Sequence, residues 1–134
     1  MSDSDRLSVT LPSAPGNLPL VRHAIRGFLD ASDVADPPAG EVLLAVTEAC
    51  ANVVQHAYVG DPEPGAIELE AELSGNRLVI SVRDHGHGFA PRPDSPGAGL
   101  GLPVIASLTD RLEIRPTPGS GTEIMMAFAL NEAA

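Results

Sequence analysis

The chain has 134 residues, and its 18 acidic and 8 basic side chains give a formal net charge of −10. All of the basic residues are arginines, so the composition argues against nucleic acid and anionic membranes as partners. The absence of lysine also excludes the P-loop and the strand lysine of protein kinases, because both sites require one. A chain of this length forms one domain (residues 1–134) that buries about two thirds of its unfolded surface.

The chain ends and the apolar runs bear on location. Residues 1–6 are polar, and we expect them to form a disordered tail without the apolar core of a signal peptide. The longest apolar runs are too short to cross a bilayer. We therefore expect a cytoplasmic protein, in which the single cysteine, Cys50, is a small core residue that forms no internal disulfide.

The first third of the chain predicts a strand and a helix. Residues 7–12 alternate apolar and polar side chains, which predicts a short strand that Pro12 ends. Asn17 is placed to cap a following helix that has Pro19 in its first turn. The core face of this helix is expected to carry Leu18, Val21, Ile25, Phe28 and Leu29.

A helix over residues 41–58 carries the first chemical signal. Five of its residues form one apolar stripe: Leu43, Val46, Cys50, Val53 and Ala57. Glu48, Asn52 and His56 follow one another at i, i+4 and i+8 on nearly the opposite face. Because most of the remaining surface is apolar, we expect the helix to be buried, so that Glu48 and Asn52 need partners. A polar, metal-bearing ligand in a pocket would supply them, and the alternative is a solvated face with a chance glutamate and asparagine.

Four further strands are predicted. Residues 66–73 alternate strictly, residues 74–76 suit a tight hairpin, and residues 77–84, 111–116 and 122–130 complete the set. Strands with one polar face and helices with one apolar face predict a two-layer α/β sandwich of the α+β class. Its helices would cover one face of a mixed, mainly antiparallel sheet.

Two glycine-containing stretches lie between these strands. In residues 84–89, Gly86 and Gly88 follow Asp84, an arrangement that allows a sharp turn and close approach to a flat ligand, although such a pattern after a strand is usually a simple turn. In residues 97–108, Gly97, Gly99 and Gly101 precede a helical run. A helix start offers free N–H donors to a phosphate without lysine, and the alternative is a plain glycine-rich loop. The proline-rich residues 89–96 between them are suited to form a lid.

The order of these signals resembles a known superfamily. Glu48 with Asn52, then Asp84 with Gly86 and Gly88, then residues 99–102 and 119–122 resemble the N, G1, G2 and G3 boxes of the GHKL ATP-binding superfamily. Within it, VTEACANVVQHAY and GLGLPVIASLTD are similar to the bacterial anti-sigma factor serine/threonine-protein kinases. The resemblance covers about residues 18–130 and implies the histidine-kinase-like ATPase fold.

The resemblance implies ATP and Mg²⁺ as cofactors and assigns roles to the helix residues. Asn52 would coordinate the Mg²⁺ that bridges the phosphates, since a carboxamide oxygen is a suitable hard ligand. Glu48 would be the general base for an attacking hydroxyl. Asp84 would accept a hydrogen bond from the adenine amino group, and Thr122 would add a hydroxyl near the base. Gly86 and Gly88 would let the adenine pack against the backbone.

The phosphates would be bound through backbone N–H groups of Gly99, Leu100 and Gly101. Some relatives place an arginine just before these glycines, whereas this chain has Gly97 and Ala98 there, and Arg92 in the lid could substitute. This departure bears on phosphate transfer more than on nucleotide binding.

The implied function is phosphorylation of a Ser or Thr on an anti-anti-sigma partner, together with sequestration of a sigma factor. The protein itself is expected to form a homodimer. The alternative is a non-catalytic module in which ATP or ADP sets a conformation that a partner recognises. The intact Glu48 favours the kinase.

Overall fold

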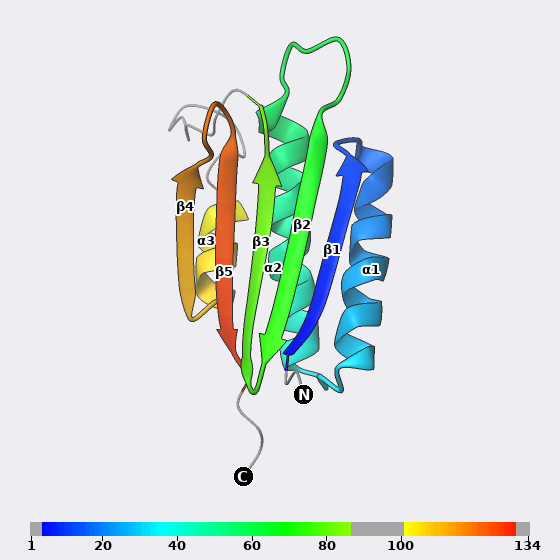
Figure 1. Cartoon of the computed structure of the whole chain (residues 1–134), viewed down its shortest axis with the longest axis vertical. Coiled ribbons are helices and arrows are strands. Elements are labelled where there is room, and N and C mark those ends of the chain that lie inside the picture. Colours follow the sequence, from blue (N-terminus) through cyan, green and yellow to red (C-terminus); the bar gives the residue numbers. More distant parts are fainter. Residues whose placement is uncertain (1–3, 87–100, 131–134) are drawn as a thin grey trace.

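The computed structural model describes residues 4–86 and 101–130 of the chain. The elements, in chain order, are β1 Ser4–Pro12, η1 Pro15–Asn17, α1 Leu18–Ala31, α2 Pro38–Asn52, η2 Val53–Ala57, β2 Ala66–Ser74, β3 Arg77–Asp84, α3 Gly101–Leu108, β4 Arg111–Pro116 and β5 Thr122–Ala129. The strands form one layer, and α1, α2 and α3 all lie on the same side of it (Figure 1). The predicted α+β two-layer sandwich is confirmed.

The sheet has five strands in the order β1-β2-β3-β5-β4. Each described pairing is antiparallel, so the sheet is more uniform than the mixed sheet that was predicted. Strands β3 and β5 are neighbours although α3 and β4 separate them in sequence. This crossover places the end of β3 beside the start of β5, where several of the predicted site residues lie.

The register of β2 and β3 follows their alternation. Ile67 is opposite Asp84 and Leu73 is opposite Leu78, so the apolar residues of both strands face the helices. The two strands join at Gly75, whose φ of 62° is in the left-handed region that a tight hairpin requires. The predicted alternation of residues 66–73 is confirmed by the burial pattern of β2.

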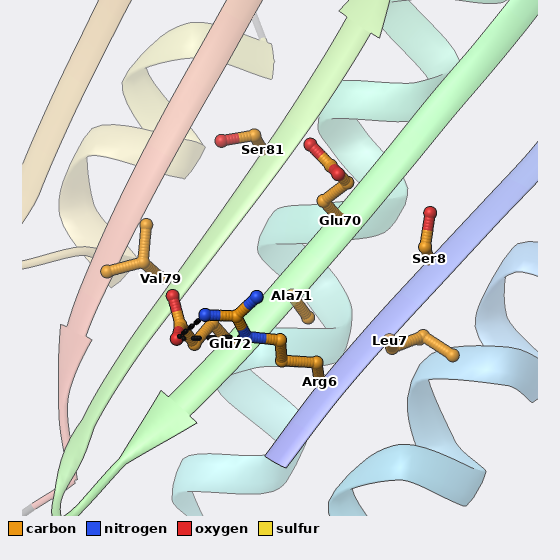
Figure 2. A pocket seen from close by; sticks show the side chains of 8 residues that line it. All are labelled: Arg6, Leu7, Ser8, Glu70, Ala71, Glu72, Val79 and Ser81. Atoms are coloured by element: carbon orange, nitrogen blue, oxygen red, sulfur yellow. Dashed lines mark hydrogen bonds and ion pairs between the residues drawn. The ribbon is translucent and has the colours of Figure 1, made fainter. Parts of the chain in front are cut away.

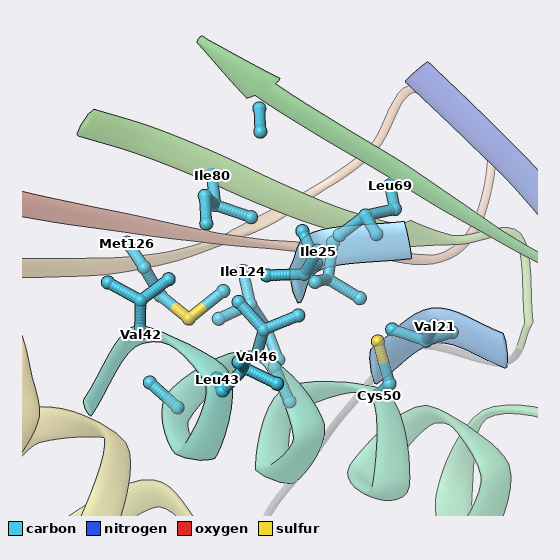
Figure 3. Close-up of a cluster of buried hydrophobic side chains, with 14 of the residues drawn as sticks. Val21, Ile25, Val42, Leu43, Val46, Cys50, Leu69, Ile80, Ile124 and Met126 are labelled. Atoms are coloured by element: carbon cyan, nitrogen blue, oxygen red, sulfur yellow. The ribbon is translucent and has the colours of Figure 1, made fainter. Parts of the chain in front are cut away.

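The core lies between the sheet and the helices α1 and α2 (Figure 3). Val42 and Val46 of α2 extend toward the strands, where Ile80 and Met126 extend toward the helix. These four side chains are at most 1% exposed, and burial of each stabilises the fold by about 1.5–3 kcal/mol. Cys50 is fully buried as predicted and lies beside Val21 of α1 (Figure 3), and burial raises the pKa of its thiol to about 12.

The predicted 41–58 helix differs in its bounds and geometry. It begins at Pro38, because proline is favourable in the first turn, where its missing N–H costs nothing. After Asn52 it widens into the π-helical segment η2. The five residues of the predicted apolar stripe are nevertheless all buried.

Two predictions near the N-terminus are wrong. Residues 4–6, assigned to a disordered tail, belong to β1, because their backbone pairs with residues 72–74 of β2. Asn17 precedes α1 but makes no capping bond: its side-chain N–H donates to the carbonyl of Pro12 at 2.9 Å. The turn η1, which ends at Asn17, leads the chain into the helix instead.

The face of the sheet opposite the helices is polar. Figure 2 shows a shallow surface pocket over β1, β2 and β3, where Arg6 forms an ion pair with Glu72 at 3.0 Å. Within residues 4–86 and 101–130, no helix has the length and apolar character needed to cross a membrane.

Candidate functional site

Two of the predicted site motifs, Glu48 with Asn52 on α2 and the glycine motif that includes Gly101, meet at the start of α3. A Cβ atom placed on Gly101 would lie 3.0 Å from Nδ2 of Asn52 and 3.3 Å from Oε2 of Glu48. Residues from motifs about fifty positions apart in sequence are thus in contact, because α3 packs against α2. Any side chain at position 101 would crowd the asparagine and the glutamate.

Asn52 has an unused hydrogen-bonding group. The residue is 5% exposed, and its Nδ2 atom has no hydrogen-bond partner among the described residues. A buried polar group without a partner costs about 1–3 kcal/mol, so its retention calls for a ligand. The half-buried Glu48 lies one turn earlier on α2.

The chemistry of this corner suits a magnesium ion held jointly with phosphates. A carboxamide oxygen is a hard ligand, and Mg²⁺ in nucleotide sites takes one or two protein ligands, with phosphates and waters completing its shell. In the part of the chain that the structure describes, no group of three or more His, Cys, Asp or Glu side chains could hold a metal by itself. Asn52 therefore fits as a protein ligand, with the nucleotide supplying others.

Asp84 is the buried carboxylate of the site. It ends β3, is 4% exposed, and accepts a hydrogen bond from the backbone N–H of Gly86 at 3.0 Å. Burial raises the pKa of this carboxyl, whereas the backbone N–H groups of Gly86 and Thr122 oppose the rise. The bonds from Gly86 and Thr122 leave further acceptor capacity on the two oxygens, as recognition of an exocyclic amine requires.

Asn52 and Asp84 line the same small cavity. It is lined by Asn52, Val53, Ala57, Asp84, Thr122 and Ile124. These residues come from α2, η2, β3 and β5, so the predicted residues Asn52, Asp84 and Thr122 surround one space. The lining is polar at these three positions and apolar between them.

Two glycines give the Asp84 segment its close neighbours. A Cβ on Gly86 would lie 1.9 Å from the carbonyl oxygen of Ala57. Gly121 has a φ of 117°, and a Cβ there would lie 2.1 Å from the carbonyl oxygen of Asp84. Gly86 is thus needed where the chain that leaves β3 passes the end of η2. The sequence patterns did not predict this contact.

Part of the predicted site lies outside the described residues. Gly88, Gly99 and Leu100 belong to this group, as do Arg92 and residues 97–98. Their assigned roles stay predictions.

Tyr58 is a residue that sequence reasoning left without a role. Its hydroxyl donates to the carbonyl of Ala66 at 2.7 Å and accepts the backbone N–H of His85 at 2.8 Å. It is the only tyrosine of the chain, and it follows His56 and Ala57 directly. Since both of its partners are backbone atoms, side-chain patterns gave no sign of them.

Comparison with known proteins places the chain in a family. Residues 11–128 match the family model described as the histidine kinase-like ATPase domain. The chain belongs to this family. The GHKL resemblance seen in the sequence is thereby confirmed, and the antiparallel sheet with helices on one face is the fold that this ATPase family predicts.

Curated relatives of this ATPase domain match it over nearly its whole length. It is 28% identical, over an alignment of 142 positions, to the anti-sigma F factor of Clostridium beijerinckii, with 98% of each chain covered. It is also 28% identical to the anti-sigma F factor of Thermoanaerobacter sp. (strain X514), with 94% of each chain covered.

Solved structures support the fold of the ATPase domain. The crystal structure of the RsbU and RsbW domains of Rv1364c from Mycobacterium tuberculosis matches with a TM-score of 0.77 at 24% identity, covering 97% of this chain and 34% of that one. The present chain therefore spans about a third of that solved chain. The SiaB–SiaC complex from Pseudomonas aeruginosa matches with a TM-score of 0.63 at 16% identity, covering 91% of this chain and 88% of that one.

Proposed function

We propose that the chain is an ATP-dependent serine/threonine-protein kinase that phosphorylates an anti-anti-sigma partner and sequesters a sigma factor. The observation that carries the proposal is the contact of Gly101 with Glu48 and Asn52, next to the cavity that holds Asp84. The names of the curated relatives support the sigma-factor partnership. The proposal includes homodimerisation as the background state.

Each residue has one task in the proposed reaction. Asp84 accepts the adenine amino group, and Thr122 supplies a hydroxyl at the same end of the cavity. The N–H at the start of α3 donates to phosphate oxygens, with Gly99 and Leu100 contributing further N–H groups. Asn52 would hold Mg²⁺, which would neutralise phosphate charge when bound.

The transfer itself centres on Glu48. As the partner's hydroxyl oxygen forms its bond to the γ-phosphorus, the bond to the β–γ bridging oxygen breaks and ADP leaves with that electron pair. A carboxylate oxygen of Glu48 accepts the hydroxyl proton. Glu48 lies one turn from Asn52, so the proton acceptor and the metal ligand share a face of α2.

A single-turnover experiment tests this proposal. The chain is mixed with ATP labelled at the γ-phosphate, Mg²⁺ and a candidate antagonist protein encoded by a neighbouring gene, and binding isotherms are recorded in parallel. Glu48→Ala should lower transfer by roughly 10²–10⁴-fold with little change in ATP affinity. Asn52→Ala should lose both, because it removes the metal ligand.

Glu41→Ala is the matched control, since it deletes an exposed carboxylate from the first turn of the same helix. It should transfer phosphate as wild type does. If wild type binds ATP but transfers no phosphate, or if Glu48→Ala transfers as well as wild type, the catalytic proposal fails. The chain would then be a nucleotide-binding interaction module.

A further inference from the structure

Tyr58 connects three segments of the fold at the edge of the candidate site. It follows η2 directly, and its hydroxyl bonds to the first residue of β2 and to the residue after β3. The latter, His85, stands between Asp84 and Gly86. The hydroxyl therefore acts on the short backbone segment that carries the buried carboxylate.

The packing around Tyr58 fixes the ring as well as the hydroxyl. A Cβ on Gly65 would lie 2.1 Å from Cε1 of the tyrosine ring, so glycine is required for the ring to occupy its position. Ala57, which precedes Tyr58, lies close to Gly86, which follows His85. The segment from Asp84 to Gly86 is thus contacted by two successive residues, Ala57 and Tyr58, and by Gly121.

The hydroxyl must keep its proton to make both bonds. It donates that proton to Ala66 while its oxygen accepts from His85. Burial, opposed in part by the backbone bond with His85, raises the pKa of Tyr58 above its ordinary value of 10.0. The group therefore stays protonated across the neutral range.

We propose that Tyr58 is a positioning residue that holds the Asp84–Gly86 backbone in the conformation in which the Asp84 carboxylate receives the adenine amino group. The inference rests on the proposed nucleotide site and adds the residue that sets its base-binding end. Among the described residues that line the cavity, Tyr58 is not included, and both hydrogen bonds of its hydroxyl are to backbone atoms, so the proposed action is through the backbone.

Tyr58→Phe is the sharpest variant, because it keeps the ring on Gly65 and removes only the hydroxyl. Loss of both hydrogen bonds should raise the Kd for ATP and for ADP about tenfold. Single-turnover transfer at saturating ATP should stay within about twofold of wild type, because Glu48 and Asn52 are untouched. Without nucleotide, the His85 amide should exchange its hydrogen faster than in wild type, since it loses its acceptor.

Gly65→Ala provides an independent route to the same effect, because the added methyl displaces the ring, and it should also weaken binding. Thr109→Val is the matched control: it deletes a hydroxyl that donates to a backbone carbonyl, that of Ile105, at the opposite end of α3 from Gly101. It should bind nucleotide as wild type does.

The outcomes separate the two proposals. If wild type binds ATP and Tyr58→Phe binds it equally well, the positioning role is overturned while the proposed function stands. If Thr109→Val weakens binding as much as Tyr58→Phe does, general destabilisation is the cause and the positioning role is again overturned. If wild type binds no nucleotide, the proposed function fails and this role fails with it.

Discussion

Asp84 combines a structural cost with the property that the proposed site needs. A carboxylate buried at the end of a strand is destabilising when charged, and its pKa is raised mainly for that reason. The same burial strengthens a hydrogen bond to a ligand, because water does not compete for the oxygens. Residues of this kind are expected at functional sites, where stability and activity favour different side chains.

Asp84→Asn should separate the effect of this carboxylate on stability from its effect on nucleotide binding. For a carboxyl with a raised pKa in the folded state, its contribution to stability is fully present below its ordinary value of 3.8 and is lost as the pH rises through the raised value. Thermal unfolding without nucleotide should therefore show the variant gaining on wild type as the pH rises from about 4 to 7. Its affinity for ATP should fall, since an amide can present a donor to the adenine amino group.

A variant that is less stable than wild type by the same amount at every pH would contradict the first part of this prediction. A variant that binds ATP as tightly as wild type does would contradict the second.

At the scale of elements, the site depends on close backbone approach. The end of η2, the end of β3 and the turn before β5 come together through Gly86 and Gly121, which have no side chains to separate them. The π-helical geometry of η2 occurs directly after Asn52, and such wide turns are frequent at functional sites. Widening of the helix here determines where Ala57 and Tyr58 lie relative to β3.

Two glycine-to-alanine substitutions should therefore differ in sign. Gly86→Ala places a methyl against the carbonyl of Ala57 and should lower the free energy of unfolding by about 1–3 kcal/mol, while also weakening ATP binding. Gly27→Ala, in the interior of α1 where nothing lies within 4 Å, should raise the free energy of unfolding by about 0.5–1 kcal/mol. Urea unfolding of both variants measures the difference, and an equal effect of the two would refute this account of Gly86.

At the scale of the whole molecule, charge gathers on the face of the sheet that no helix covers. Arg83 bonds to Glu123 at 2.7 Å, to Glu70 at 3.3 Å and to Glu68 at 3.4 Å. Hydrogen bonds from His85 and then from Arg83 lower the pKa of Glu68. One guanidinium thus contacts three carboxylates in a chain whose formal net charge is −10.

Removal of this guanidinium should make stability strongly dependent on salt. Arg83→Gln leaves three carboxylates close together and should cost about 1 kcal/mol at low ionic strength. The loss should shrink as NaCl is raised to about 0.5 M, because salt screens the repulsion. Arg26→Gln, which removes the same charge from an exposed position on α1, is the control and should have a much smaller effect. Equal salt dependence of both variants would rule out a specific role for the Arg83 contacts.

The sequence by itself determined the elements and their faces. The apolar residues of the alternating segment 66–73 and the apolar stripe from Leu43 to Ala57 are buried as predicted. Both patterns are readable in the sequence because side-chain periodicity follows directly from strand and helix geometry. Fold class and family also followed from local patterns, namely the order of Glu48 with Asn52, Asp84, and the glycines. Each of these patterns is formed by residues that are close in sequence, so it can be recognised without knowing which distant residues it contacts.

Only the tertiary structure decided how distant backbone segments meet. The strand order β1-β2-β3-β5-β4, the bond of Asn17 to Pro12, and the two bonds of Tyr58 all involve backbone atoms, which are the same in every residue. The contact of Gly101 with Asn52 likewise depends on how α3 packs against α2. Because a backbone carbonyl or N–H gives no residue-specific signal, such contacts emerge only when the whole chain has packed.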